Sequence, residues 1–126
     1  MTKKENNYWS KKLDKFSYKI LRESGTEMPF SGKYNMHFED GSYKCKGCGN
    51  SLFESNSKFD SGCGWPSFDQ SIKGSIIYKE DNSLDRTRTE IICSKCEGHL
   101  GHVFNDGPTE TGMRYCVNSA SLNFKK

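Results

Sequence analysis

The chain has 126 residues with a formal net charge of +3, and 28% of its residues are charged while 13% are aromatic. This length allows one hydrophobic core, so we expect a single domain over residues 1–126, with residues 1–8 as a flexible N-terminus. Because the excess positive charge lies mainly in the first 22 residues, a nucleic-acid-binding surface is not indicated. With no apolar run long enough for a membrane span and no secretory signal pattern, we expect a cytoplasmic protein without a membrane segment.

An apolar stripe predicts a helix in the N-terminal part. Trp9, Leu13, Phe16 and Ile20 follow one another at steps of four, three and four residues, which is the spacing of one helix face. Lysines occupy the other faces, so the helix could lie on a membrane surface, but a helix packed against the core is the favoured interpretation. The helical period ends after Gly25.

The remainder of the chain alternates short runs of β-branched and aromatic residues with turn signals. Closely spaced short strands without a strand–helix–strand rhythm predict a mainly β, antiparallel fold. The predicted strands lie near Ser42–Lys46, Ser75–Tyr78, Thr87–Cys93, Gly101–Phe104 and Met113–Leu122.

Two segments, 43–52 and 91–100, share one pattern: a strand end, a C-x-x-C pair, and a leucine four residues later. Two such knuckles supply the four thiolates of a tetrahedral zinc site, which is saturated and therefore structural. The predicted ligands of this single zinc ion are Cys45, Cys48, Cys93 and Cys96. A thioredoxin-like dithiol is an alternative, but its usual strand–helix setting is missing. Another is a site in which His99 and His102 join the second pair, at a spacing tighter than that of a zinc finger.

Two cysteines remain, and Cys116 is the more distinctive. On a strand over 113–122, Arg114, Cys116 and Asn118 share one face, while the alternate residues form the core face. A guanidinium beside a thiol favours the reactive thiolate. The alternative is that Cys116 is a small buried apolar residue.

Cys63 lies between Gly62 and Gly64 and is followed by Trp65 and Pro66. Flanking glycines allow movement, which suits a cysteine that exchanges with another, although a rigid turn with Trp65 in the core is also possible. Near the second knuckle, His99 and His102 could donate a proton at neutral pH.

These features together resemble the type B family of methionine sulfoxide reductases, which act on the R epimer. The resemblance spans roughly residues 9 to 124 and rests on the following motifs: Thr26-Glu-Met-Pro-Phe-Ser-Gly, Cys45-x-x-Cys48, Ser61-Gly-Cys-Gly-Trp-Pro-Ser-Phe, Cys93-x-x-Cys96 with His99-Leu-Gly-His102-Val-Phe, Asp106-Gly-Pro, and Arg114-Tyr-Cys-Val-Asn-Ser.

The resemblance implies two antiparallel sheets in a barrel-like or tent-like arrangement, with peripheral N-terminal helices and a zinc ion away from the reaction centre. It implies that Cys116 attacks methionine-R-sulfoxide in oxidised proteins and becomes a sulfenic acid. Cys63 then forms a disulfide with it, which a thioredoxin-like protein reduces, so that the enzyme repairs proteins under oxidative stress. Trp65 resembles the wall that receives the methyl group. His99, His102 and Asn118 resemble the polar groups around the sulfoxide oxygen, and Arg114 resembles the neighbour of the thiolate.

Two other function classes agree with parts of the pattern. A zinc-knuckle domain with a basic helix could be a binding module, in which Cys63 and Cys116 have no chemical role. A thiol pair that senses peroxide would form the same disulfide without any sulfoxide substrate. The polar face around Cys116 favours the reductase over the binding module.

Overall fold

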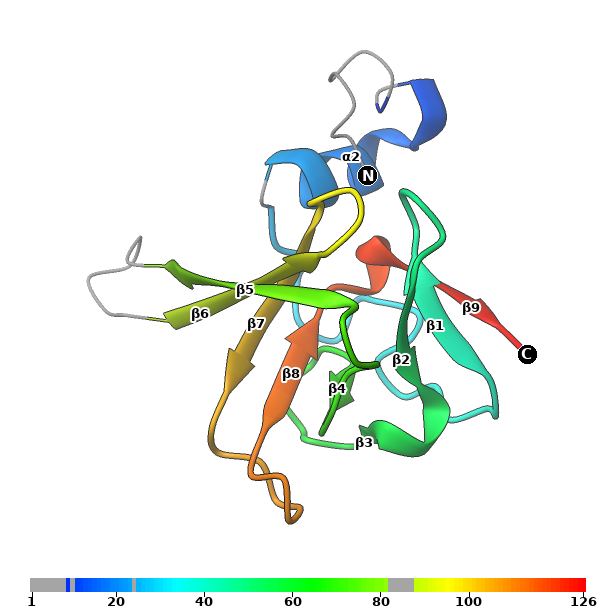
Figure 1. The fold of residues 1–126 in the computed structure, drawn as a ribbon. Helices are drawn as coiled ribbons and strands as arrows, with labels where there is room; N and C mark the ends of the chain where they lie inside the picture. The colour runs from blue at the N-terminus through cyan, green and yellow to red at the C-terminus, as the bar shows by residue number, and fades with distance from the viewer. Residues whose placement is uncertain (1–8, 10, 24, 82–87) are drawn as a thin grey trace.

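A computed structural model describes residues 9, 11–23, 25–81 and 88–126 (Figure 1). The predicted flexible N-terminus at 1–8 lies outside these ranges. In chain order the elements are α2 (Lys15–Glu23), β1 (Ser42–Cys45), β2 (Ser51–Glu54), η1 (Ser55–Ser57), β3 (Lys58–Phe59), β4 (Ser67–Phe68), β5 (Ile76–Asp81), β6 (Arg88–Cys93), β7 (His99–Phe104), β8 (Arg114–Val117), η2 (Ser119–Ser121) and β9 (Leu122–Lys125).

The strands form two antiparallel sheets, as predicted. The smaller sheet has the order β2-β1-β9, and the larger has the order β3-β4-β8-β7-β6-β5. Helix α2 lies at one end, beside the knuckle that follows β6 (Figure 1). None of the helices in the described ranges has the length and apolar character needed to cross a membrane.

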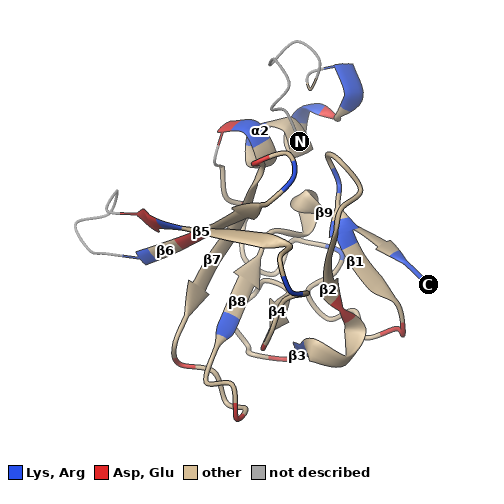
Figure 2. Ribbon diagram, viewed as in Figure 1, with Lys and Arg blue, Asp and Glu red and all other residues tan. Residues whose placement is uncertain are grey.

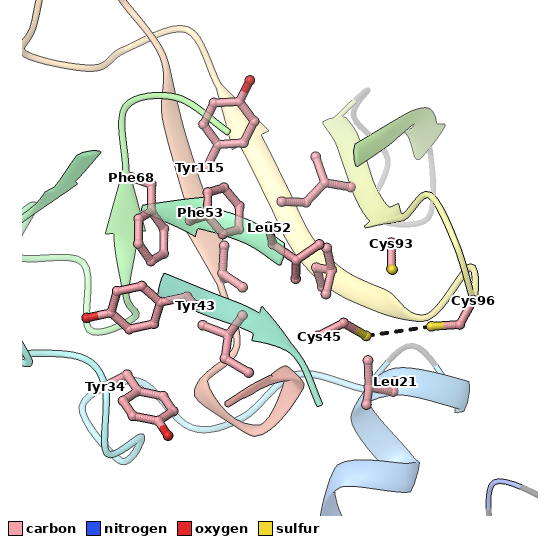
Figure 3. Packing of buried hydrophobic residues seen from close by; sticks show 14 of the residues in the cluster. Leu21, Tyr34, Tyr43, Cys45, Leu52, Phe53, Phe68, Cys93, Cys96 and Tyr115 are labelled. Carbon is pink, nitrogen blue, oxygen red and sulfur yellow. Dashed lines mark hydrogen bonds between the residues drawn. The ribbon is translucent and has the colours of Figure 1, made fainter. Parts of the chain in front are cut away.

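Aromatic side chains from both sheets interlock in the core (Figure 3). Phe53 of β2 stacks on Phe68 of β4 with ring centroids 4.2 Å apart. Tyr43 of β1 meets Phe68 edge-on at 5.0 Å, and Tyr115 of β8 meets Phe53 at 5.7 Å. Each such pair contributes about 0.5–1.5 kcal/mol beyond the burial of its area. The core therefore ties β4 and β8 of the larger sheet to the smaller one.

The predicted strand over Met113–Leu122 is too long. Strand β8 ends at Val117, and after the η2 turn the chain enters β9 of the other sheet at Leu122. The amide of Ser121 donates to the carbonyl of Asn118 at 3.0 Å and closes this turn. An alternating pattern of side chains indicates the two faces of a strand, but it does not reveal where the chain passes from one sheet to the other. The prediction therefore joined β8 and the start of β9 into one strand.

The predicted N-terminal helix is interrupted. Residues 9, 11 and 12 are helical, the chain then bends at 13–14, and α2 begins at Lys15. Asp14 accepts a hydrogen bond from the amide of Ser17 at 3.1 Å, which caps the new helix. Lys and Arg residues recur along this segment in Figure 2, with acidic and other residues between them.

The interruption changes which residues face the core. Phe16 is 51% exposed, so its predicted place on the buried stripe is wrong. Trp9 and Ile20 are 1% exposed, and Leu21, which lies outside the predicted stripe, is 2% exposed. Because the helix starts again after Asp14, its apolar face is rotated relative to the continuous helix that the sequence predicted. The prediction that this segment packs against the core is confirmed.

Replacing Ile20 with Ala should therefore lower the free energy of unfolding by about 2–5 kcal/mol, because a buried branched side chain is lost. The matched change Phe16→Ala should alter it by no more than about 0.5 kcal/mol. Urea unfolding followed by circular dichroism measures both. Equal losses in the two variants would favour the continuous stripe that the sequence predicted.

Candidate active site and metal centre

The two C-x-x-C knuckles meet. Their four Sγ atoms all lie within 4.8 Å of one another. Cys45 and Cys96 are 3.6 Å apart, and Cys48 and Cys93 are 3.5 Å apart. Sulfurs at ~2.3 Å from a tetrahedral ion stand ~3.8 Å apart, so this geometry fits a four-thiolate metal site.

The internal repeat is confirmed in the backbone of the knuckles. The amide of Gly49 donates to Cys45 O at 2.8 Å, and that of Glu97 donates to Cys93 O at 2.9 Å. Gly49 and Glu97 both have positive φ, 80° and 62°. The two turns therefore have one shape, although the second one places a residue with a side chain in a conformation that favours glycine.

Helix α2 covers this centre. Leu21 reaches toward the Cys45–Cys96 pair in Figure 3, and the Arg22 guanidinium donates to Cys96 O at 2.9 Å. The alternative ligands His99 and His102 lie outside the cluster and bind carboxylates instead. None of the four clustered cysteines lines the cavity, described below, that Cys63 and Cys116 border.

The remaining cysteines form a close pair. The Sγ atoms of Cys63 and Cys116 are 3.2 Å apart. Cys116 lies on β8, where it is directly opposite His102 of β7 on one side and Ser67 of β4 on the other. Since opposite residues of antiparallel strands share a face, imidazole, thiol and hydroxyl line up across three strands.

This pair borders a cavity of about 310 Å³. The cavity contains most of the predicted site residues and several that the sequence did not indicate. Its lining consists of Thr26, Cys63, Trp65, Arg88, Gly101, His102, Phe104, Arg114, Cys116, Val117 and Asn118. Arg114 and Cys116 share one face of β8 as predicted, and Asn118, one residue beyond the end of the strand, also lines the cavity.

Arg114 is held beside the thiol. Its Nη1 lies 3.7 Å from Cys116 Sγ, while its Nε and Nη2 donate to the two oxygens of Asp106 at 2.8 and 3.1 Å. The guanidinium also stacks 4.6 Å above the Phe104 ring. A two-point ion pair with an aromatic platform sets the direction of this cation.

In this arrangement Cys63 is the more acidic thiol. The hydrogen bond from Cys116, supported by Ser61 and Ser67, lowers the pKa of Cys63 to about 4. The same sulfur contact, together with burial, raises the pKa of Cys116, and Arg114 only partly opposes this effect. The sulfur contact is the largest cause of both shifts, and either sulfur can be its donor. Arg114 lowers the pKa of Cys116, so its role in favouring the Cys116 thiolate stays a prediction.

The two histidines have different positions. His102 lines the cavity and its Nε2 lies 2.8 Å from Asp81, which also accepts from Arg88 at 3.1 Å. His99 is 4% exposed, lies outside the cavity lining, and its Nδ1 is 2.7 Å from Glu90. Burial lowers the pKa of His99 despite the carboxylate. Only His102 is brought to the thiol pair.

Trp65 and Asn118 are held by a common segment. The Trp65 indole donates to Glu27 O, and Asn118 Oδ1 accepts from Glu27 N, both at 3.0 Å. Asn118 Nδ2 donates to Leu100 O at 3.0 Å, so this amide is more fully engaged than the sequence implied. Both side chains form part of the cavity wall.

Gly101 allows β7 to approach β8 closely. A Cβ at this position would lie 2.0 Å from Cys116 O, so the strand that carries the thiol approaches bare backbone. Sequence reasoning missed Arg88, Phe104 and Thr26 as lining residues. Thr26 begins the motif Thr26-Glu-Met-Pro-Phe-Ser-Gly, which is a signal that could have identified it. Nothing in the local sequence distinguishes Arg88 from other charged residues of strands.

The family model for the SelR domain matches residues 13–126. The chain belongs to the SelR domain family. A SelR relative named peptide methionine sulfoxide reductase MsrB, from Teredinibacter turnerae, is 54% identical over 124 residues, which are 98% of this chain and 92% of the relative. Proteins of the same name from Leptospira interrogans and Variovorax paradoxus are 53% and 57% identical, covering 98% and 87% of this chain and 95% and 82% of their own.

The fold has a likeness outside the SelR family. A crystal structure of the Mis18 "Yippee-like" domain superposes with a TM-score of 0.56 at 18% identity, covering 70% of this chain and 97% of that domain. At this identity the likeness concerns the fold alone.

Replacing Cys116 with Ala should raise the pKa of Cys63, because its main hydrogen-bond donor is lost. Alkylation of Cys63 by iodoacetamide should be nearly independent of pH between about pH 5 and 8 in the reduced wild type and should rise with pH in the variant. Ser61→Ala, which removes a weaker donor, should have a smaller effect. Peptide mass spectrometry measures the alkylation rates. Parallel rate–pH profiles in the wild type and in Cys116→Ala would contradict a pKa of Cys63 that depends on Cys116.

Proposed function

We propose that this SelR-family chain is a peptide methionine sulfoxide reductase that acts on the R epimer in oxidised proteins. The observation that carries the proposal is the 3.2 Å pair of Cys63 and Cys116 at a cavity that His102 and Arg114 also line. The names of its relatives support the reaction. The R epimer rests on the resemblance of the motifs.

In the first step Cys116 attacks the sulfoxide sulfur. Its proton passes along the sulfur contact to Cys63, and Arg114 stabilises the charge that develops on Cys116. This attack forms a bond between the Cys116 sulfur and the substrate sulfur, and His102, which lines the cavity, protonates the substrate oxygen. The oxygen then bonds to the Cys116 sulfur as its bond to the substrate sulfur breaks, and the sulfur–sulfur bond breaks as well, which leaves Cys116 as a sulfenic acid. The sulfoxide is reduced to methionine as Cys116 is oxidised.

In the second step Cys63 condenses with the sulfenic acid, releasing water and forming the Cys63–Cys116 disulfide. The sulfurs need to approach by only about 1 Å to reach the disulfide bond length of ~2.05 Å. A protein dithiol of the thioredoxin type then reduces this disulfide by exchange. One sulfoxide and one dithiol are consumed in each cycle.

The remaining predicted residues surround the substrate. Trp65 forms a wall for the methyl group, and Asn118 limits the cavity beside it. His99 supports His102 from behind, with ring centroids 5.7 Å apart. Zinc is the proposed occupant of the four-cysteine centre, where thiolate ligands leave no open position and the ion would stabilise the fold.

Presenting the reduced protein with a methionyl peptide as separate R and S sulfoxides tests the reaction. With dithiothreitol as reductant, methionine should form from the R epimer alone, and Cys116→Ser should abolish it. The control is Cys63→Ser without reductant, which should form one methionine per chain and retain a sulfenic acid that dimedone traps. The wild type should instead end as a disulfide. No methionine from either epimer, with folded protein, would leave the peroxide-sensing or binding interpretations.

The metal proposal has its own test. Purified protein should contain about one zinc ion per chain, and Cys45→Ser should lose it and lower the melting temperature by about 10 °C or more. Cys63→Ser is the matched control and should keep both the ion and the melting temperature. Elemental analysis and thermal unfolding measure these quantities. Full zinc retention in Cys45→Ser would contradict the proposed site.

A further inference from the structure

Glu27 is a buried acid in a segment without regular secondary structure. It is 2% exposed, whereas its neighbours Thr26 and Met28 are exposed, Met28 by 74%. A carboxylate taken out of water is costly unless polar groups compensate for its lost hydration. Its position therefore depends on the contacts that it makes inside the protein.

Three hydrogen bonds connect Glu27 to two other segments, the loop that carries Trp65 and the η2 turn with its N-cap Asn118. Its amide donates to Asn118 Oδ1, its carbonyl accepts from the Trp65 indole, and its Oε1 accepts from the amide of Ala120, each at 3.0 Å. Two of the partners, Trp65 and Asn118, line the cavity. The third, Ala120, lies in the turn that follows β8.

The Glu27 side chain is closely packed, with Oε1 bound to the amide of Ala120 and Oε2 buried without a hydrogen-bond partner. A Cβ at Gly32 would lie 2.2 Å from both Glu27 Oε2 and Ser119 Oγ, so the chain packs closely over the carboxylate. Ser119 in turn accepts a hydrogen bond from the amide of Tyr34 at 3.1 Å. The carboxylate is therefore enclosed between the η2 turn and the 32–34 segment, while the Glu27 backbone faces the cavity wall.

We propose that Glu27 is a positioning residue, whose carboxylate anchors segment 25–28 to the η2 turn and thereby sets Trp65 and Asn118 as the walls that receive the substrate. This inference rests on the proposed function for its kinetic part. The thiol pair is positioned separately, by β8 and by the loop that carries Cys63. Losing the anchor therefore loosens substrate binding more than it slows the chemical step.

The kinetic test measures R-sulfoxide peptide reduction by Glu27→Ala, with Glu27→Gln as the conservative variant. Glu27→Ala should raise KM about tenfold while kcat changes less, and Glu27→Gln, which keeps an oxygen acceptor, should restore much of the loss. Glu23→Ala, an exposed acid on α2, is the matched control and should behave as wild type. Glu27→Asp replaces Glu27→Ala if the latter does not fold, because it keeps the charge but falls short of Ala120.

A second measurement does not require activity. The chain has two tryptophans, so Trp9→Phe leaves Trp65 as the single fluorescent reporter. In that background, the Glu27 variants should increase acrylamide quenching of Trp65, whereas Glu23→Ala should not. Quenching in Glu27→Gln should be closer to that of the wild type than quenching in Glu27→Ala. A general loss of stability would instead lower the melting temperature without this recovery in Glu27→Gln.

The outcomes separate the two proposals. Unchanged KM and unchanged quenching in Glu27→Ala, with an active wild type, would overturn the positioning role alone. A fall in kcat with constant KM would also overturn it. If the wild type reduces neither epimer, the proposed function fails, and the quenching measurement still decides whether Glu27 positions Trp65.

Discussion

Strand β8 runs between β4 and β7, and its hydrogen-bonded register with both strands determines which side chains meet Cys116. His102 and Ser67 stand opposite the thiol because of that register. A shift of one residue would turn Cys116 to the other face of the sheet. The close approach of Gly101 to Cys116 O and the packing of Tyr115 against Phe53 both oppose such a shift.

The metal centre and the thiol pair divide the six cysteines by role. Four meet where two equivalent turns and helix α2 come together, and they are mostly buried. The other two border a cavity and contact each other through their sulfur atoms. This separation fits the proposed roles, in which the four clustered thiolates bind a metal ion and the other two cysteines change their oxidation state.

Charge around the cavity is balanced by pairs. Arg114 is bound by Asp106, and His102 and Arg88 share Asp81. Such pairs fix the directions of cations that would otherwise be free to turn, and they keep positive charge next to Cys116, the proposed nucleophile. In the proposed positioning role, the buried carboxylate of Glu27 fixes Trp65 and Asn118 in the cavity wall. It acts through the hydrogen bonds of its own backbone and not through an ion pair.

The sequence by itself determined the features that repeat or alternate: the two C-x-x-C knuckles, the antiparallel β character, and the shared face of Arg114, Cys116 and Asn118. Periodicity and spacing are local properties of the chain, so they can be recognised in the sequence without the tertiary structure. Tertiary structure alone decided the break before Lys15, the change of sheet after Val117, the separate positions of His99 and His102, and the place of Glu27. It also decided that Cys63 and Cys116 contact each other and shift each other's pKa, because a pKa depends on distances between groups that lie far apart in the chain.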